Sequence, residues 1–350
     1  MKELKDFIQQ IKNKARRHVQ NPREPVGYWS EDDRILGVKT RSFVIILRTS
    51  GCRWSRYSGC TMCGYFNNSL DRPVKEDELL AQIKYVFSRY NGEEAIKIFT
   101  SGSFLDDEEM PNKLQIEILK RCAEQGNVKK ISVESRPEFV EEEKIRRLKE
   151  AVEPAKFEVS IGLESANNLV LQYAVNKGFK FKDYREAVDV LKKENVLVKT
   201  YVLIKPPFLT EYEAIKDSVE TVEKIKDATD TVSFNPVSVH KNTLVEYLWK
   251  RGEYRPPWLW SVVDILRRSK VVAPNVEIKC DITGGGTQRG AHNCGGCDRV
   301  MLDAIHRFSL EQDVDIFQVL ECGCKETWQD YLDLETFSFG SLVVEYEKSG

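Results

Sequence analysis

Residues 42–63 read SFVIILRTSGCRWSRYSGCTMC, a short apolar segment followed by a loop that carries Cys52, Cys60 and Cys63. The apolar segment is β-branched at its centre, which predicts a buried strand over residues 42–49. The three cysteines therefore follow directly on the C-terminal end of a strand. In parallel α/β folds, the loops at this end of the strands carry the functional sites.

Strand-like and helix-like segments alternate after this loop. The pattern predicts five more strands, at residues 95–100, 130–134, 157–163, 196–204 and 231–236. Helical periodicity separates them, at residues 74–90, 107–125, 138–150, 168–176, 183–194 and 210–225. This alternation is typical of a parallel sheet with right-handed crossovers. No GxGxxG or GxxxxGK[ST] loop follows the first strand, so the α/β pattern favours a partial (β/α)6 TIM-like barrel over a doubly wound open sheet.

The segments on either side of this barrel differ from it in composition. Residues 1–41 are expected to form an amphipathic helix, at residues 1–20, and then a loop-rich extension. We assign residues 42–240 to the barrel. Residues 241–350 contain rigid aromatic and Gly-rich stretches and more cysteines, which predicts a small Cys-rich, metal-binding C-terminal module.

The C-terminal cysteines form two short pairs. Cys294 and Cys297 precede a predicted helix at residues 300–319, and Cys322 and Cys324 follow it. Four thiolates from two such pairs are typical of a structural zinc site, and an auxiliary iron–sulfur cluster is the alternative. Further candidate ligands close by in the sequence are Cys280 and His292.

The composition excludes several classes of protein. The chain has 350 residues, 41% hydrophobic and 31% charged, which is ordinary for a globular protein. No apolar run is long enough for a membrane span, and no signal peptide is recognisable at the N-terminus. We therefore expect a cytoplasmic protein with reduced thiols. The formal net charge of −2 gives no indication of autonomous nucleic-acid binding.

The count of three cysteines in the first loop bears on the chemistry. A structural zinc site is closed by four ligands, so zinc would need one remote ligand here. On a [4Fe–4S] cluster, three thiolates leave one iron open. The open iron can chelate the amino and carboxylate groups of S-adenosylmethionine (SAM), and one electron from the cluster then cleaves the sulfonium bond. The resulting radical abstracts hydrogen from an unactivated carbon.

These residues resemble the radical SAM superfamily. The usual CxxxCxxC spacing is lengthened here to seven residues in the first gap, and Met62 stands where an aromatic residue is usual. The resemblance implies that Ser101, Gly102 and Ser103 hold the methionyl amino group. It also implies a SAM contact at Met62, largely through the backbone, and further contacts along the chain from Glu134, Arg136, Glu164 and Asn235.

Two signatures in combination, CxWxxxxGCTMCGY and RGAHNCGGCD followed by CGC, are similar to those of the radical SAM proteins of archaeosine biosynthesis (RaSEA). This family resemblance implies a C–N lyase that acts on archaeal tRNA. By this resemblance, a partner archaeosine synthase subunit would attach lysine to the preQ0 base at position 15. The radical SAM subunit, supplied by an external electron donor, would then cleave the lysine C–N bond and leave archaeosine.

Two other functions remain open from the residues. One is a different radical SAM tRNA reaction, of the elongator type or a methylthiotransfer. A methylthiotransferase would have three further N-terminal cysteines, and residues 1–51 contain none. An elongator-type enzyme would have an acetyltransferase domain. The other function, from another class, is a non-catalytic zinc-bearing RNA-binding subunit.

Overall fold

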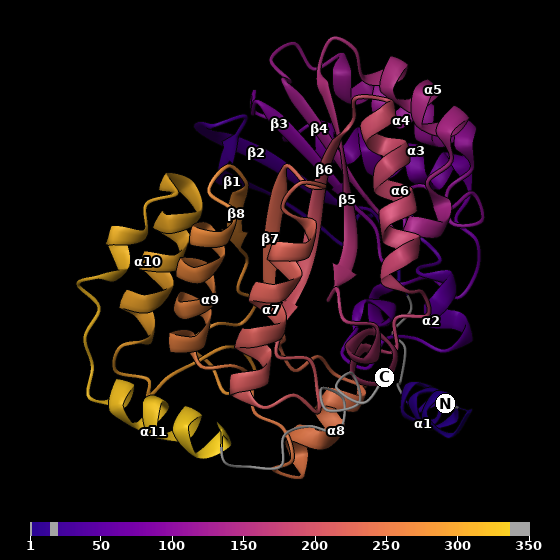
Figure 1. Cartoon of the computed structure of the whole chain (residues 1–350). Helices are drawn as coiled ribbons and strands as arrows, with labels where there is room; N and C mark the ends of the chain where they lie inside the picture. Colours follow the sequence, from indigo (N-terminus) through magenta and orange to yellow (C-terminus); the bar gives the residue numbers. More distant parts are fainter. Residues whose placement is uncertain (1, 15–19, 337–350) are drawn as a thin grey trace.

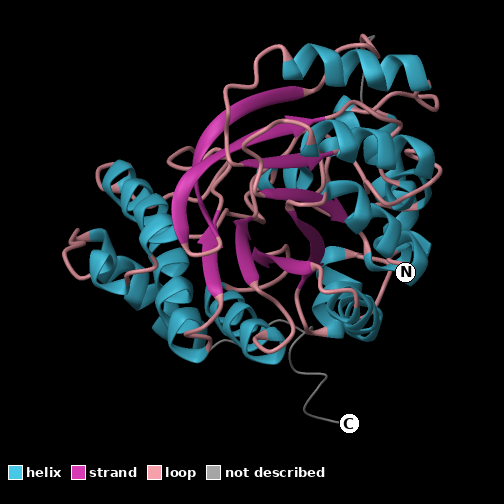
Figure 2. Cartoon of the chain, turned by 90° about the horizontal axis from the view of Figure 1, so that it is seen from above, coloured by secondary structure: helices cyan, strands magenta, loops and turns pink. Residues whose placement is uncertain are grey.

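The structure is a computed structural model, and it describes residues 2–14 and 20–336. Within these residues, eight strands form one sheet in chain order, β1 to β8. The first pair, β1 and β2, is antiparallel, and each later neighbouring pair is parallel. The sheet curls around an axis and the helices lie mainly on its outside (Figures 1 and 2). The predicted partial barrel is thereby confirmed.

The strands are β1 (Gly27–Ile35), β2 (Val38–Ile46), β3 (Ala95–Phe99), β4 (Lys130–Ser135), β5 (Lys156–Glu164), β6 (Leu197–Ile204), β7 (Thr231–Pro236) and β8 (Glu277–Cys280). The α-helices are α1 (Lys2–Asn13), α2 (Arg53–Tyr57), α3 (Glu76–Phe87), α4 (Asn112–Ala123), α5 (Glu142–Val152), α6 (Phe181–Lys193), α7 (Glu211–Ile225), α8 (Leu244–Lys250), α9 (Leu259–Val272), α10 (Asp298–Glu311) and α11 (Cys324–Thr336). Short helical segments are η1 (Tyr65–Asn68), η2 (Pro137–Phe139), η3 (Val170–Val175) and η4 (Val314–Phe317).

All six predicted strands are present, and the sheet has two more. The expectation that residues 21–41 are loop-rich is wrong, because β1 lies within them and pairs with β2. The turn between these strands is the pair Leu36 and Gly37, both with positive φ (51° and 82°). Two such residues make the tight hairpin turn whose twist matches that of the strands.

Residues 241–350 also take part in the barrel sheet, because β8 pairs with β7. The predicted helix at residues 300–319 is too long, since α10 ends at Glu311 and η4 follows separately. The first helix ends at Asn13, and residues 15–19 of the predicted helix lie outside the described part of the chain. The division of the chain into three segments stays a proposal.

Alternate side chains of the strands face the helices and form the core. Ile96, Ile131, Val159 and Val232 are fully buried, and they belong to one cluster with apolar residues of the surrounding helices. This arrangement is the usual one for parallel strands covered by helices. The core therefore lies outside the curled sheet, between the sheet and its helices.

The inner face of the sheet carries charged side chains instead. Asp33 on β1 accepts from Lys97 on β3 at 2.8 Å and from Lys279 on β8 at 2.7 Å. The two edge strands of the sheet are therefore bridged by side chains, although no main-chain ladder joins them. A second buried pair joins Lys130 on β4 to Glu158 on β5 at 2.8 Å.

We expect Lys130→Met to destabilise the protein by about 3–5 kcal/mol near neutral pH, because it leaves a buried carboxylate without its partner. Burial alone would raise the pKa of Glu158, but the charges of Lys130 and Lys199 outweigh burial and lower it to about 2. The stabilisation by Glu158 is thus complete above its unfolded pKa of 4.5 and is lost as the pH falls towards 2. Urea unfolding should show that the difference in unfolding free energy between wild type and variant becomes smaller as the pH falls from 4.5 towards 2.

Lys129→Met is the matched control for this prediction. Lys129 forms an exposed pair with Glu94, and its side chain is 63% exposed, so its loss should cost only about 0–1 kcal/mol. Equal stability losses in the two variants would contradict a structural role for the buried pair.

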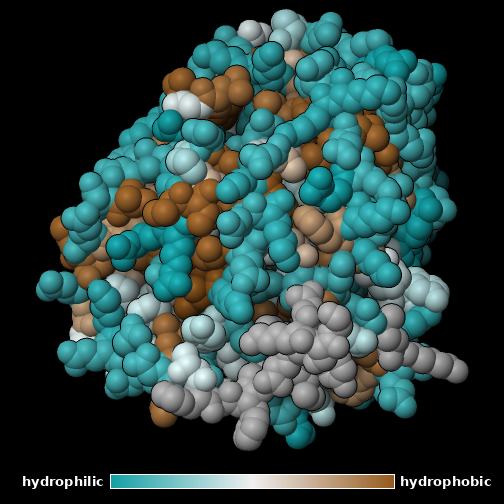
Figure 3. All heavy atoms as spheres, viewed as in Figure 1, coloured by the Kyte–Doolittle hydropathy of each residue, from teal (hydrophilic) through white to brown (hydrophobic). Residues whose placement is uncertain are grey.

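The outer surface is mixed in character. On the face shown in Figure 3, hydrophilic side chains predominate and hydrophobic ones form separate patches. None of the helices in the described ranges is long and apolar enough to cross a membrane.

Candidate active site

The cysteine loop leaves β2 at the end of the sheet where the parallel strands end, close to α1 and α8 (Figure 1). Cys52 directly precedes α2, which fills the long first gap between the cysteines. Cys60 and Cys63 lie on the next turn, where the Cys63 N–H donates to the Cys60 carbonyl at 3.4 Å. The seven-residue gap therefore holds a short helix and brings Cys60 back towards Cys52.

The three thiols are close enough to influence one another. Burial raises the pKa of Cys52, and the Cys60 charge adds to this effect while Arg136 opposes it. Burial and then Cys60 raise the pKa of Cys63 to about 12. Each of the three side chains is partly exposed. A site of three thiols fits a cluster with one iron open to a ligand.

Helix α1 covers the outside of the cysteine loop. The Gln9 side chain donates to the Ser58 carbonyl at 2.7 Å, and Lys12 donates to the Ser55 carbonyl at 2.9 Å and to its hydroxyl at 2.8 Å. A hollow of about 280 Å³ lies beside this contact, and Cys52 is among the residues that line it. The N-terminal helix thus fixes the loop between the first two cysteines.

The turn after β3 packs directly on Cys52. The Cys52 N–H donates to the Ser101 carbonyl at 3.2 Å. A Cβ at Gly102 would lie 2.6 Å from the Cys52 nitrogen and 2.1 Å from a carboxylate oxygen of Glu109, so only glycine fits there. The Ser103 N–H donates to Glu109 at 2.7 Å.

Glu109 is a residue of this site that the sequence pattern did not reveal. It is fully buried and also accepts from the Thr49 hydroxyl on the loop after β2. Burial raises its pKa to about 7. The carboxyl group thus joins the loops after β2 and β3. Its position before α4, within a run of acidic residues, resembles a solvated surface segment and gave no signal of this role.

The segment after β4 lies beside the same turn. The Glu134 carboxyl accepts from the Thr100 N–H at 2.9 Å, and burial raises its pKa to about 8. The Arg136 N–H donates to the Ser103 hydroxyl at 3.2 Å. The Arg136 guanidinium lies between two rings, 5.7 Å from the centre of Trp54 and 5.1 Å from that of Phe179. The structure thus brings Glu134 and Arg136 to the cysteine loop.

The remaining predicted SAM contacts differ in their surroundings. Glu164 has a positive φ of 75° and forms a 2.7 Å ion pair with Lys177. Met62 packs against a smaller apolar cluster that also contacts Cys60. Asn235 lies on β7 in register with Leu203 and is partly exposed. Their role in binding SAM stays a prediction.

The four cysteines Cys294, Cys297, Cys322 and Cys324 form a compact set, with all four sulfur atoms within 4.8 Å of one another. Two sulfur pairs are 3.7 Å apart and a third is 4.0 Å apart. Tetrahedral coordination at a Zn–S distance of ~2.3 Å places sulfurs about 3.8 Å apart. The geometry therefore fits a single metal ion.

Polar neighbours surround these thiols. Trp260 donates from Nε1 to the Cys324 sulfur at 3.3 Å, and Asn293 donates to the Cys297 sulfur at the same distance. Backbone N–H groups, first that of Cys297, lower the pKa of Cys294 to about 7. Burial raises the pKa of Cys297 and raises that of Cys324 to about 12, and the Asn293 and Trp260 donors act against this effect. Such donors favour the thiolate, the form that binds metal.

The two alternative ligands lie outside this set. Cys280 is a buried residue of β8. Its backbone N–H donates to the Ser309 hydroxyl at 3.1 Å. His292 Nδ1 lies 2.8 Å from the Gly290 carbonyl. The sequence could not exclude them, because distance along the chain does not show which way a side chain points.

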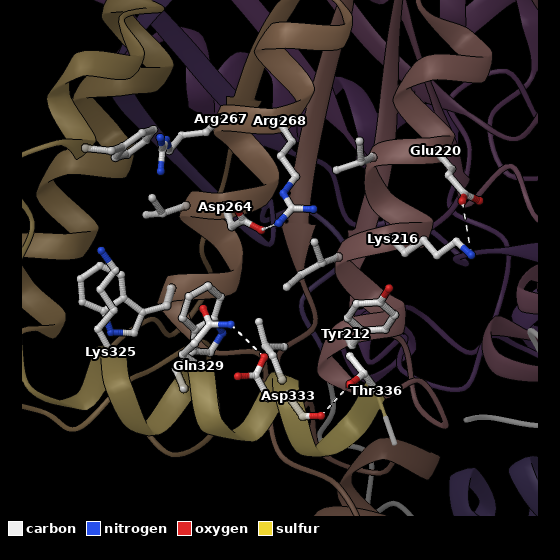
Figure 4. A pocket seen from close by; sticks show the side chains of 17 residues that line it. Tyr212, Lys216, Glu220, Asp264, Arg267, Arg268, Lys325, Gln329, Asp333 and Thr336 are labelled. Atoms are coloured by element: carbon white, nitrogen blue, oxygen red, sulfur yellow. Dashed lines mark hydrogen bonds and ion pairs between the residues drawn. The ribbon is translucent and has the colours of Figure 1, made fainter. Parts of the chain in front are cut away.

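A larger hollow of about 590 Å³ lies outside the barrel, between α7, α9 and α11. Its labelled side chains include Asp264, which accepts from Arg268 at 2.8 Å, and Lys216, which pairs with Glu220 at 3.8 Å (Figure 4). These charges are satisfied by their own helix neighbours. We therefore place the candidate active site at the barrel end and not in this groove.

Comparison with known proteins shows the family of the chain. The model of the radical SAM superfamily matches residues 46–219. An archaeosine synthase subunit beta from Methanosarcina acetivorans is 36% identical over 344 residues, which cover 98% of this chain and 99% of that protein. Another, from Thermococcus kodakarensis, is 39% identical over 307 residues, which cover 86% of this chain and 95% of that protein.

Solved structures give weaker similarity. An Elp3 from Methanocaldococcus infernus with an N-terminal deletion is 17% identical, with a TM-score of 0.48, and the match covers 76% of this chain and 63% of that one. Methylornithine synthase is 13% identical with the same TM-score, over 82% of this chain and 85% of that one.

The cysteine loop, the curled sheet and the matched residues define a radical SAM protein. Within that superfamily, the chain belongs to the archaeosine synthase subunit beta family.

Proposed function

We propose that this protein is a radical SAM lyase of tRNA modification, which cleaves the C–N bond of a lysine adduct of preQ0 at position 15 of archaeal tRNA. The observation that carries the proposal is the loop with three thiols, whose Cys52 N–H bonds the turn after β3, in a chain similar along its length to proteins named archaeosine synthase subunit beta. The name of the relatives supports a partner subunit, which would transfer the lysine.

Cys52, Cys60 and Cys63 would hold a [4Fe–4S] cluster. When bound, the cluster and SAM supply a 5′-deoxyadenosyl radical that abstracts hydrogen from the substrate. The chain's own residues prepare this site. Burial raises the pKa of the Cys52 thiol, and the Arg136 charge acts against this effect, in the direction of the thiolate. Glu109 accepts from the Ser103 N–H and so holds the Ser101–Ser103 turn against Cys52. The backbone carbonyls of this turn would accept from the SAM amino group.

We infer that the C-terminal cysteines bind one zinc ion with a structural role. Sulfur separations of 3.7–4.0 Å support a single ion over an auxiliary iron–sulfur cluster, because the ligands of a cluster bind different irons and lie further apart. The cluster of thiols joins the start of α10 to that of α11.

Incubation with tRNA that carries lysine-modified preQ0, in the presence of SAM and a reductant, tests the proposed reaction. We expect nucleoside mass spectrometry to show archaeosine, together with 5′-deoxyadenosine in equal amount. Transfer RNA with unmodified preQ0 is the control and should remain unchanged. 5′-Deoxyadenosine without any change in the tRNA would indicate a different radical SAM substrate. A protein that contains zinc alone and cleaves no SAM would instead be a non-catalytic RNA-binding subunit.

A further inference from the structure

One buried lysine on the inner face of the sheet differs from its neighbours. Lys97, Lys130 and Lys279 each form an ion pair of 2.7–2.8 Å with a carboxylate. Lys199 on β6 lies among them, and in the described part of the chain it has no ion pair. Its Nζ lies 5.0 Å from the centre of the Tyr201 ring, which is two residues nearer the end of the strand. The side chain therefore extends towards the barrel mouth.

The nearest acidic groups are already engaged elsewhere. Glu158 acts on Lys199 electrostatically, but its two oxygens accept from Lys130 at 2.8 Å and from the Ser132 hydroxyl at 2.5 Å. Asp281 accepts from Ser233 at 3.0 Å and likewise forms no ion pair within the described residues. The ammonium group of Lys199 is thus surrounded by charge and contacts no carboxylate.

An ammonium in this setting is costly to the fold. Lys199 is only 5% exposed. Burial, and then the charge of Lys97, lower its pKa to about 8, so the ammonium is still the main form at neutral pH. Buried charges are normally paired, and unpaired ones are concentrated at functional sites.

Two hydroxyl groups lie beside this lysine, those of buried Ser160 and of half-buried Tyr201. Ser160 on β5 is the register partner of Lys199. Its Oγ is buried without a hydrogen bond of normal geometry, although it lies near the Tyr201 hydroxyl. Burial keeps the Tyr201 hydroxyl protonated by raising its pKa. One ammonium and two hydroxyls can all donate, which suits a ligand with several acceptor oxygens.

We propose that Lys199, Ser160 and Tyr201 bind a carboxylate carried by the substrate, at the end remote from the cleaved bond. The proposal rests on the proposed function, because a lysine attached through its side-chain nitrogen presents its α-carboxylate at the far end of a flexible chain. Lys199 lies four residues before Leu203, the register partner of Asn235, and so about 13 Å further from the mouth along β6. The base would remain near the mouth while the amino-acid end extends inwards.

The side chains between the barrel mouth and Lys199 are less buried than Lys199 itself, which is 5% exposed. Glu134, Tyr201 and Asn235 lie on three strands, and each is partly exposed on the inner face. The substrate arm of the proposal would extend past these three side chains towards Lys199.

A pair of small probes tests the carboxylate subsite directly. Nε-acetimidoyl-L-lysine carries both the amidine and the α-carboxylate, whereas N-acetimidoylcadaverine lacks only the carboxylate. Calorimetry with the reconstituted full chain and SAM should show that wild type binds the lysine probe about tenfold to a hundredfold more tightly. Lys199→Met should bring the two affinities within about threefold of each other. Equal affinities in wild type, or no measurable binding of the lysine probe, would overturn the proposal.

Thermal unfolding distinguishes a binding role from a structural one. Lys199→Met removes a buried charge without an ion pair and also a charge that favours ionised Glu158, so its Tm should stay close to that of wild type. Lys130→Met, at an equally buried and paired position, should lower the Tm and keep the preference for the lysine probe. A large loss of Tm in Lys199→Met would show that Lys199 supports the fold and would overturn the proposal.

The two proposals fail in different ways. If modified tRNA is unchanged while the probes still bind in a Lys199-dependent manner, the subsite stands and the proposed reaction falls. If Lys199→Met converts the lysine-modified tRNA with the kcat/KM of wild type, the reaction stands and the subsite falls.

Discussion

Cys60→Ala protein, reconstituted anaerobically with iron and sulfide, is expected to lose the visible absorption of a [4Fe–4S] cluster and all measurable SAM cleavage. The Cys60 carbonyl accepts from the Cys63 N–H, so the two residues share one turn. Burial raises the pKa of both Cys52 and Cys63, and Cys60 adds to this effect. Loss of a residue that only hydrogen-bonds to a metal ligand lowers metal affinity or activity about 10–100-fold, so loss of a ligand itself should lower them further. Iron analysis, the visible spectrum and 5′-deoxyadenosine formation measure the effect.

Cys122→Ala is the control for this variant. Cys122 is a fully buried cysteine of α4 within the apolar core, and burial raises its pKa. Its truncation should lower stability and leave the iron content and the spectrum unchanged. An undiminished spectrum in the Cys60 variant would show that the triad does not hold the cluster.

Cys297→Ser should remove the second metal and destabilise the C-terminal part of the chain. Cys297 lies directly before α10, is 9% exposed, and its sulfur is 3.7 Å from that of Cys324. Structural zinc in small domains contributes about 10–16 kcal/mol of folding free energy, and even part of this would lower the Tm strongly. We expect metal analysis to show the loss of about one zinc per chain with the iron retained.

Cys280→Ser is matched to this variant, because Cys280 is a buried cysteine of the same region that lies outside the compact set. It should keep its zinc. Loss of iron from the Cys297 variant, in place of zinc, would show that these thiols hold an auxiliary cluster.

The elements that the sequence could predict are those with a strong local pattern. The six strands in the middle of the sheet, β2 to β7, carry apolar and β-branched residues on the face that the helices bury. This pattern made them recognisable. β1 and β8 lie at the edges of the sheet. β1 reads GYWSEDDRI, whose charged residues resemble a loop, and β8 has only four residues, EIKC. Neither pattern reveals that these strands pair with their neighbours in the sheet.

The candidate site shows the same limit. The cysteine triad and the four C-terminal cysteines were recognisable from spacing, since few other residues offer that chemistry. Glu109 and Lys199 were not, because each has ordinary neighbours in the sequence. Their surroundings become unusual only when strands far apart in the chain meet. The seven-residue gap after Cys52 has a simple explanation in α2, which sequence spacing alone could not supply.

Closure of the barrel by Asp33 and Lys279 also governs the order of events during translation. These residues are 246 positions apart. The ribosome therefore completes the cysteine loop and seven of the eight strands before it makes the lysine that bridges the two edges. Until then, Lys97 is the one lysine or arginine of the described residues that pairs with the buried Asp33, which has no partner on β8. Contacts between residues this far apart in the sequence form slowly, so we expect this seam to be among the last parts of the barrel to form.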